Sequence, residues 1–253
     1  MNFRCFAILI ALGMSACVAV TYPAQTISEK VAPGVHGRMI LPEGEGPFPG
    51  ILMLHGASGV IGSDDQTARA LSAEGFAVLV LDYYRGGADL VDGDAGRTPD
   101  HIRMRWLSNI ERGAEYLRNH QQILPDEIGI VGFSRGAQYG LKYANEHSEI
   151  LAVIGYYGLL YDYDEGQRPD LKSVENLPPT LLLHGKADKI VPIGYAYEIM
   201  DLMERAGRHA ELVTFPDMSH AWWFVDTSDA SQSAWRESVD VSVRFLRDRF
   251  SRQ

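Results

Sequence analysis

The sequence contains almost no cysteine and no excess of basic charge. Its two cysteines, Cys5 and Cys17, lie within the first 17 of 253 residues. The rest of the chain therefore has no thiol for a disulfide, a thiolate metal cluster or a cysteine nucleophile. Lys and Arg number 23 against 33 Asp and Glu, which gives a formal net charge of −10. Because the field of such a chain repels polyanions, the composition argues against nucleic-acid binding.

Motifs that indicate a bound nucleotide or a metal are also absent from the sequence. There is no Walker phosphate-binding loop, no G-x-G-x-x-G after a strand, no H-E-x-x-H and no paired-cysteine motif. We therefore predict no cofactor and no metal. Gly and Pro, at 25 and 12 residues, are too few for a fibrous or low-complexity chain, whereas 46% of the residues are hydrophobic. This composition can fill one large globular core.

The only pronounced apolar run in the first part of the chain is short and lies at the N-terminus. Arg4 precedes an apolar stretch over residues 5–14, which is too short to span a bilayer but typical of a secretory signal peptide. Ser15-Ala16-Cys17 then resembles a bacterial lipobox, in which the cysteine receives a lipid after cleavage, although Met14 replaces the usual leucine. The alternative is ordinary cleavage nearby, which would remove Cys17 or leave it as a free thiol.

This N-terminal segment predicts both the domain limits and the destination of the protein. We expect a signal peptide over residues 1–16, an N-terminal tether over 17–25 and a single domain over 26–253. Either mode of cleavage gives an exported protein, located in the bacterial periplasm or held at the outer membrane by a lipid on Cys17. We expect a monomer or a homodimer, with a small molecule as its partner.

The remainder of the chain alternates short apolar runs with amphipathic helices, without a repeat or a linker. This alternation predicts an α/β fold with a mostly parallel sheet covered on both faces. The connections over residues 83–101 and 159–179 are too short for a large cap domain, so we expect an open or loosely covered pocket. The predicted strands span residues 35–41, 51–55, 76–81, 128–133, 151–156, 180–184 and 211–215, and the predicted helices span 65–73, 102–119, 135–146, 194–206 and 231–249.

The strongest chemical motif is a G-x-S-x-G sequence from Gly132 to Gly136, placed where an apolar strand gives way to a helix. This is the context of a nucleophile elbow, a tight turn that lifts Ser134 above the edge of the sheet. Small residues are needed on both sides because the chain passes close to itself there. A serine hydroxyl is a weak nucleophile at neutral pH, so it requires a base and a carboxylate that orients the base.

One aspartate and one histidine downstream fit these two roles. Asp188 lies in a glycine-containing turn after one apolar strand, and His220 lies in the loop after the next. Ligands bind at such strand ends in open α/β sheets, and the chain order Ser, Asp, His is that of α/β-hydrolases. Either residue could instead be a turn former or a solvated loop residue. His55 and His184 both precede a glycine at a strand end, and we interpret them as supports of their turns.

Two backbone N–H groups are the expected donors to the negatively charged oxygen of a tetrahedral intermediate. One belongs to Arg135, which directly follows the nucleophile. The other is expected from the glycine-rich loop over residues 55–59, at Ala57. Ser58 in the same loop lacks the flanking glycine spacing of a nucleophile elbow.

Four stretches of the chain carry a resemblance to a known family: Gly132-Phe-Ser134-Arg-Gly136-Ala, Val153-Ile-Gly155-Tyr156-Tyr157-Gly158, Pro178-Pro-Thr-Leu-Leu-Leu-His-Gly185-Lys-Ala-Asp188 and Ser219-His220. By these stretches, residues 50–245 resemble the dienelactone hydrolase family of α/β-hydrolases. The resemblance implies an α/β-hydrolase fold, a three-layer α-β-α sandwich whose eight-stranded sheet has one antiparallel strand, with no large cap domain. It also implies hydrolysis through a covalent acyl-enzyme, without metal or cofactor.

The chain departs from the founding members of that family at three positions. They have a cysteine at Ser134, a glutamate at Gly56 and a basic residue a few positions after the histidine, where this chain has 221-AWWF. A neutral acyl or aromatic ester therefore suits the sequence better than a dienelactone, because aromatic side chains form broad apolar walls. Arg85 alone is placed to offer a cation to a substrate carboxylate. The predicted substrate-binding residues are Tyr84, Arg85, Tyr157, Trp222 and Trp223.

The sequence thus predicts a serine hydrolase that cleaves carboxylic esters with the triad of Ser134, His220 and Asp188. Two alternatives remain open. The same triad could cleave amides or thioesters, as in a peptidase or an acyl thioesterase. A non-catalytic envelope lipoprotein could also use the scaffold to bind a ligand, because a fold alone does not fix a function.

Overall fold

The computed structural model describes residues 26–28, 31–84, 98–161 and 166–250. The predicted signal peptide and tether, including Cys17, lie outside these residues, as does Arg85. Within the described parts of the chain, no helix combines the length and the apolar character needed to cross a membrane.

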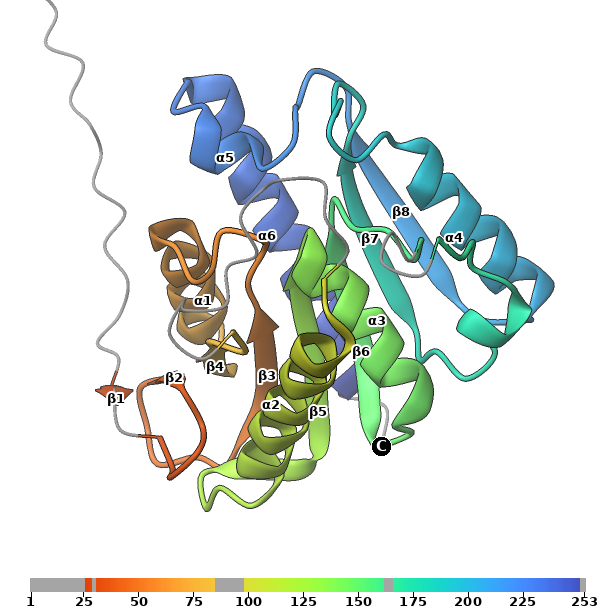
Figure 1. The fold of residues 1–253 in the computed structure, drawn as a ribbon. Helices are drawn as coiled ribbons and strands as arrows, with labels where there is room; N and C mark the ends of the chain where they lie inside the picture. The colour runs from red at the N-terminus through yellow and green to blue at the C-terminus, as the bar shows by residue number, and fades with distance from the viewer. Residues whose placement is uncertain (1–25, 29–30, 85–97, 162–165, 251–253) are drawn as a thin grey trace, which may run out of the picture.

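The centre of the fold is a sheet to which the described residues contribute eight strands, in the order β1-β2-β4-β3-β5-β6-β7-β8 (Figure 1). Among these strands β2 alone runs against the rest, because it pairs antiparallel with both β1 and β4, whereas every other ladder is parallel. The predicted α/β-hydrolase sheet is thereby confirmed. The strands are β1 (Thr26–Ser28), β2 (Gly37–Leu41), β3 (Phe48–Leu54), β4 (Ala77–Leu81), β5 (Ile123–Phe133), β6 (Ile150–Tyr156), β7 (Thr180–Gly185) and β8 (Ala210–Phe215).

Helices cover both faces of this sheet and complete a three-layer sandwich (Figure 1). Side chains of α2, α3 and α4 fill the apolar core on one face, and those of α1, α5 and α6 fill the core on the other. The bounds are α1 (Gly62–Ala73), α2 (Asp100–Arg118), α3 (Arg135–Glu146), α4 (Gly194–Arg205), α5 (Trp222–Val225) and α6 (Asp229–Phe250), with a 3-10 turn η1 (Leu171–Ser173).

The long amphipathic elements follow their sequence patterns. Along α2, the buried residues Trp106, Ile110, Ala114 and Leu117 recur every three or four positions and form one stripe on the sheet. β4 is buried at every position, as expected for a central strand covered on both faces. The seven predicted strands and five predicted helices are all present; α3 has the predicted bounds, and the ends of the others are shifted.

The differences from the predicted elements are confined to short segments and element ends. The strand pattern did not predict β1, and the helix pattern did not predict α5, because three or four residues are too few to show a period. Helix α1 begins at Gly62, three residues before the predicted start, because the carboxylate of Asp64 accepts a hydrogen bond from the N–H of Ile61 (2.9 Å) and closes the first turn.

Candidate functional site

Ser134 lies at the turn between β5 and α3 in a backbone conformation that L-residues rarely adopt, with φ 52° and ψ −112°. A hydrogen bond from its N–H to the carbonyl of Tyr156 (2.9 Å) holds the turn on the end of β6. A Cβ atom on Gly132 would lie 2.5 Å from the carbonyl oxygen of Gly136, and one on Gly136 would overlap the carbonyl oxygen of Leu54. Both glycines of the motif are therefore required by backbone packing, as expected of a nucleophile elbow.

This packing predicts a large penalty for Gly136→Ala. The added Cβ would meet backbone atoms of β3, which cannot move as a side chain can, so the elbow and the strand must separate. We expect a loss of about 2–4 kcal/mol in the free energy of unfolding, measured by chemical denaturation. Gly194→Ala is the matched control because a Cβ there meets no atom within 4 Å. Equal stability of the two variants would contradict the packing argument.

The structure brings Ser134, His220 and Asp188 together in one hydrogen-bonded chain. The Oγ of Ser134 lies 3.1 Å from Nε2 of His220, and Nδ1 of His220 lies 2.7 Å from Oδ2 of Asp188. Because an ionised carboxylate only accepts, Nδ1 carries the proton and donates it, which leaves Nε2 to accept from the serine hydroxyl. The Asp188 side chain is fully buried, whereas the His220 side chain is 14% exposed. The hydrogen bonds thus lead from the buried carboxylate of Asp188 to the hydroxyl of Ser134.

Hydrogen bonds from His220 and from two backbone N–H groups act on the pKa of Asp188. Its Oδ1 atom accepts hydrogen bonds from the N–H groups of Ile190 (2.9 Å) and Val191 (2.8 Å). Burial is the largest single effect and raises the pKa, but the bonds from His220 and from these two N–H groups together outweigh it. The pKa of Asp188 is consequently held below its ordinary value, and its charge is available to stabilise a protonated imidazole.

The loops that carry Asp188 and His220 are joined by backbone hydrogen bonds. β7 and β8 are neighbouring parallel strands, so both loops leave the same edge of the sheet. The N–H of Lys186 donates to Phe215 (2.9 Å), and that of Ala187 donates to Met218 (3.1 Å). The ring of His184 donates from Nε2 to the carbonyl of Val191 (2.8 Å). His184 therefore supports the Asp188 turn, as predicted, and burial lowers its pKa.

The glycine-rich loop lies directly against the elbow. A Cβ atom on Gly56 would be 3.7 Å from the Cβ of Ser134. The N–H of Gly59 donates to the carbonyl of Gly56 (3.2 Å), and Ala57 in this turn is exposed. Arg135 is the first residue of α3, so its N–H belongs to the helical turn in which N–H groups have no intrahelical acceptor.

The side chain of Tyr84 is buried next to Arg135, the residue that follows the nucleophile. Its hydroxyl accepts a hydrogen bond from Nη1 of Arg135 (2.9 Å), and its ring lies 4.4 Å from that of Trp106. Only 1% of Tyr84 is exposed. Tyr84 holds Arg135 at the start of α3, and its contact with the substrate stays a prediction. His55 stacks on the adjacent Tyr83 ring at 4.2 Å and supports the turn after β3, as predicted.

Tyr157 is the predicted aromatic residue that reaches the imidazole. Its ring meets the edge of the His220 ring with 4.6 Å between centroids. Trp222 and Trp223 pack behind Tyr157, at 5.8 Å and 5.6 Å, and both are buried in the core. The two tryptophans support Tyr157, and their contact with the substrate stays a prediction.

One buried carboxyl beside the site was not predicted. Asp64 in the first turn of α1 is 2% exposed. Burial raises its pKa to about 6, although the Ile61 N–H and the nearby His55 act in the opposite direction. The only signal in the sequence is an acidic residue near the start of a helix, which predicts a helix cap rather than a carboxyl group with a raised pKa. Carboxyls with raised pKa values often accompany active sites.

The raised pKa predicts how Asp64 affects stability with pH. A folded-state pKa of about 6 against an ordinary 3.8 means that stability is greatest below pH 3.8 and falls as pH rises toward and through 6. Asp64→Asn keeps an acceptor for Ile61 without the charge. At neutral pH we expect it to be more stable than the parent by up to about 3 kcal/mol, with a smaller difference at pH 4. Urea denaturation at both pH values measures this, and a pH-independent difference would contradict it.

The strand order and the elbow between β5 and α3 place the protein among the α/β-hydrolases. The model of the dienelactone hydrolase family matches residues 35–249, and the chain belongs to that family. Among the described residues, no group of three or more His, Cys, Asp or Glu side chains is arranged to hold a metal ion.

The chain is also similar to individual curated proteins and to solved structures. The chain is similar to the mouse "Acyl-coenzyme A thioesterase 2, mitochondrial", with 33% identity over 175 residues, which is 64% of this chain and 36% of that protein. It is also similar to the mouse "Acyl-coenzyme A amino acid N-acyltransferase 1", with 35% identity over 120 residues, 47% of this chain and 26% of that protein. The chain thus spans about a third or less of these curated relatives. A putative dienelactone hydrolase from Klebsiella pneumoniae shares the fold, with a TM-score of 0.70, 20% identity, and coverage of 91% of this chain and 100% of that one.

Proposed function

We propose that the protein is a serine hydrolase that cleaves carboxylic esters of small molecules through a covalent acyl-enzyme. The observation that carries the proposal is the hydrogen-bonded chain from Ser134 through His220 to Asp188, with separations of 3.1 Å and 2.7 Å. Membership of the dienelactone hydrolase family supports it. Such a chain supplies the base, and the orienting carboxylate, that a serine hydroxyl needs in order to attack a carbonyl.

In the first half of the reaction, Oγ of Ser134 attacks the ester carbonyl while Nε2 of His220 takes the hydroxyl proton. The carbonyl oxygen becomes negatively charged, and the N–H groups of Ala57 and Arg135 donate to it. The tetrahedral intermediate then collapses, the bond to the alcohol breaks, and the imidazolium returns the proton to the leaving oxygen. Asp188 stabilises the imidazolium during this interval because its own pKa is held low.

In the second half, water replaces the alcohol. His220 takes a proton from the water, whose oxygen attacks the acyl-enzyme carbonyl, and the same two N–H groups stabilise the second intermediate. Collapse breaks the bond to Ser134, which recovers its proton from His220 and releases the carboxylic acid. Tyr157 limits rotation of the imidazole through its edge contact at 4.6 Å. No step requires a metal or a cofactor.

A panel of p-nitrophenyl esters, acyl thioesters and p-nitroanilides tests the proposal. We expect turnover of the short-chain esters by the wild-type protein and a loss of about 10³-fold or more in His220→Ala, because the variant lacks the base. Circular dichroism of both proteins controls for folding. Failure of the folded wild-type protein to turn over any member of the panel would favour a non-catalytic, ligand-binding role.

Thioesters are the second candidate substrate class. The curated relatives include a protein named as an acyl-coenzyme A thioesterase and another named as an acyltransferase that uses an acyl-coenzyme A. The same serine, histidine and backbone donors would act on a thioester carbonyl. A higher kcat/KM for acyl thioesters than for esters of the same acyl group would assign the protein to this class.

We also propose that the protein is exported and carries a lipid on Cys17. The support is the short apolar N-terminal run, followed by small residues and a cysteine. Mass spectrometry of the protein from a bacterial membrane fraction should show a diacylated Cys17 as the first residue. A mature protein that lacks Cys17, or has it unmodified, would contradict lipidation.

A further inference from the structure

The carbonyl group of Gly56 is held by two hydrogen bonds. Nδ1 of His55 lies 2.7 Å from its oxygen, and the N–H of Gly59 donates to the same oxygen over 3.2 Å. A carbonyl oxygen only accepts, so Nδ1 of His55 carries a proton and donates it. A Cβ atom on Gly56 would be 3.7 Å from the Cβ of Ser134. The carbonyl that His55 holds therefore belongs to a residue in van der Waals contact with the nucleophile.

The direction of this carbonyl sets the direction of the next N–H group. The peptide between Gly56 and Ala57 is trans, so its C=O and N–H bonds point in opposite directions. The N–H of Ala57 consequently points away from the His55 ring. It donates no hydrogen bond to the residues that the structure describes, and Ala57 is exposed. This N–H group is thus available to a ligand on the outer side of the loop.

The neighbours of His55 hold its ring in one orientation. The ring stacks on that of Tyr83 with 4.2 Å between centroids and 10° between planes, and it meets the edge of the Tyr84 ring at 4.6 Å. The hydroxyl of Tyr83 donates to the backbone carbonyl of His55 (3.0 Å), and Asn109 of α2 donates to the carbonyl of Tyr83 (3.0 Å). His55 is completely buried. Its ring therefore cannot turn away from Gly56 without displacing these contacts.

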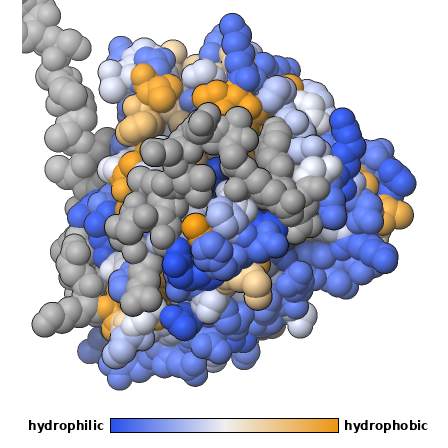
Figure 2. Space-filling model, in the orientation of Figure 1, coloured by the Kyte–Doolittle hydropathy of each residue, from blue (hydrophilic) through white to orange (hydrophobic). Residues whose placement is uncertain are grey.

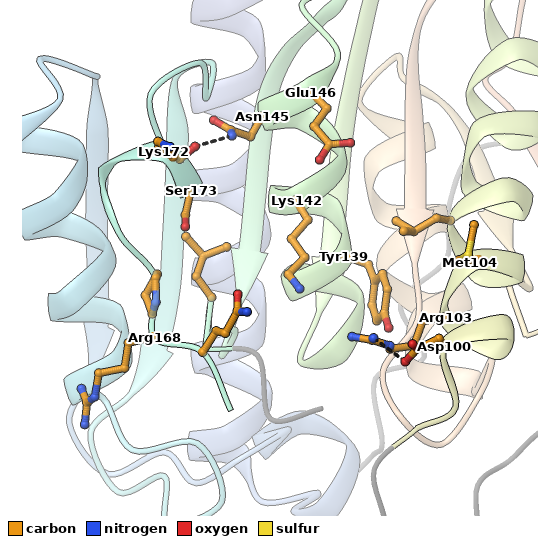
Figure 3. A pocket seen from close by; sticks show the side chains of 14 residues that line it. Asp100, Arg103, Met104, Tyr139, Lys142, Asn145, Glu146, Arg168, Lys172 and Ser173 are labelled. Atoms are coloured by element: carbon orange, nitrogen blue, oxygen red, sulfur yellow. Dashed lines mark hydrogen bonds and ion pairs between the residues drawn. The ribbon is translucent and has the colours of Figure 1, made fainter. Parts of the chain in front are cut away.

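The aromatic rings behind His55 belong to the core. Tyr83 and Trp106 lie 6.0 Å and 5.7 Å from the ring of Tyr139, which is buried but lines a groove of about 560 Å³ along the outer side of α3 (Figure 3). The described residues that line this groove include neither Ser134 nor His220. The surface of this face is mostly hydrophilic (Figure 2). The rings thus form a rigid support between the groove and the glycine-rich loop.

The second ring nitrogen of His55 is buried without a hydrogen bond. Nε2 has no hydrogen-bond partner among the described residues, and it lies 3.6 Å from Oδ1 of Asp82. A buried polar atom without a partner destabilises the folded state, and an apolar side chain of similar size would avoid this cost. Packing alone therefore does not explain a histidine at this position, whereas the donor at Nδ1 does.

We propose that His55 is a positioning residue for the reaction. By holding the Gly56 carbonyl, its ring directs the N–H of Ala57 toward the negatively charged oxygen of the tetrahedral intermediates. The inference rests on the proposed hydrolase function and adds a residue to it. A donor that is already oriented stabilises the developing charge without having to turn during the reaction. Without the bond from Nδ1, Gly59 alone holds the carbonyl, and the peptide is free to rotate.

The variants His55→Leu and His55→Asn form a matched pair. The two side chains have the same shape and both lack the ring, but asparagine places an NH₂ group near the position of Nδ1. With p-nitrophenyl butyrate, we expect His55→Leu to lower kcat by about 10- to 100-fold and to change KM by less than about twofold, because the donor acts on the transition state. The kcat of His55→Asn should be at least about fivefold above that of His55→Leu.

The comparison of the two variants separates positioning from packing. Both lose the stacking on Tyr83, so a role in packing alone would lower kcat equally in the two, and chemical denaturation measures the loss of stability that they share. Equal kcat values, or an effect confined to KM, would overturn the proposal.

The position of the proton on His55 is measurable in the wild-type protein without turnover. Long-range proton–nitrogen correlation spectra of protein with nitrogen-labelled histidine should show a proton on Nδ1, in the signal that disappears in His55→Asn. A bare Nδ1 could not donate to Gly56 and would overturn the proposal even if esters were hydrolysed. A proton on Nδ1 in a protein that hydrolyses no ester would support the bond to Gly56 and overturn the hydrolase assignment instead.

Discussion

Ser134→Ala is expected to lower kcat on any good ester substrate by about 10⁴-fold or more, because it removes the atom that forms the acyl-enzyme. The stability of the variant should match that of the parent. The elbow is held by the backbone bond to Tyr156 and by the two glycines of the motif, none of which involves Oγ. Initial rates with p-nitrophenyl acetate and thermal denaturation of both proteins measure the two effects separately.

Ser58 provides the discriminating comparison for this prediction. It lies in the exposed loop beside the elbow and is the nearest rival nucleophile in the sequence. Ser58 lies in the loop between β3, which ends at Leu54, and α1, which begins at Gly62, so no direct strand-to-helix turn fixes it as one fixes Ser134. A loss of 10⁴-fold in Ser58→Ala, together with near wild-type turnover in Ser134→Ala, would assign the nucleophile to the other loop.

Asp188→Asn is expected to lower kcat by about 10³- to 10⁴-fold without disrupting the fold. The N–H groups of Ile190 and Val191 both donate to one oxygen of Asp188, so an asparagine would place its carbonyl oxygen there. Its NH₂ group would then face Nδ1 of His220. The imidazole would have to accept at Nδ1 and carry its proton at Nε2, which leaves no lone pair to take the proton of Ser134.

Asp217→Asn is the matched control for this substitution. Asp217 is exposed and precedes His220 by three residues, so its replacement removes a nearby charge without touching the imidazole. We expect activity close to that of the parent. Equal losses in the two variants would show that general charge near the loop, rather than the tautomer of His220, limits the reaction.

The sequence predicted the parts of this protein whose signals are local or periodic. The stripe of Trp106, Ile110, Ala114 and Leu117 has the period of a helix, and α2 is present. The G-x-S-x-G spacing identifies a backbone constraint at Gly132 and Gly136 that the structure contains. Neighbouring parallel strands end at the same edge, so Asp188 and His220 could be expected to meet.

The remaining features depend on contacts between distant segments. Trp222 and Trp223 look like pocket residues beside His220, but whether an aromatic ring faces the substrate or the core is decided by what packs against it. Tyr84 is buried against the rings of Tyr83 and Trp106, and its hydroxyl accepts a hydrogen bond from Arg135, 51 residues further along. The groove along α3 requires residues from α2, α3 and η1, which no single stretch of the sequence shows together.

Labelling with a fluorophosphonate, followed by peptide mass spectrometry, is the most direct test that His220 activates Ser134. We predict one adduct per chain, on the peptide that contains Ser134, and loss of that adduct in a folded His220→Ala variant. A folded wild-type protein that remains unlabelled, or that is labelled on a different residue, would contradict the assignment of the 3.1 Å contact as the catalytic one.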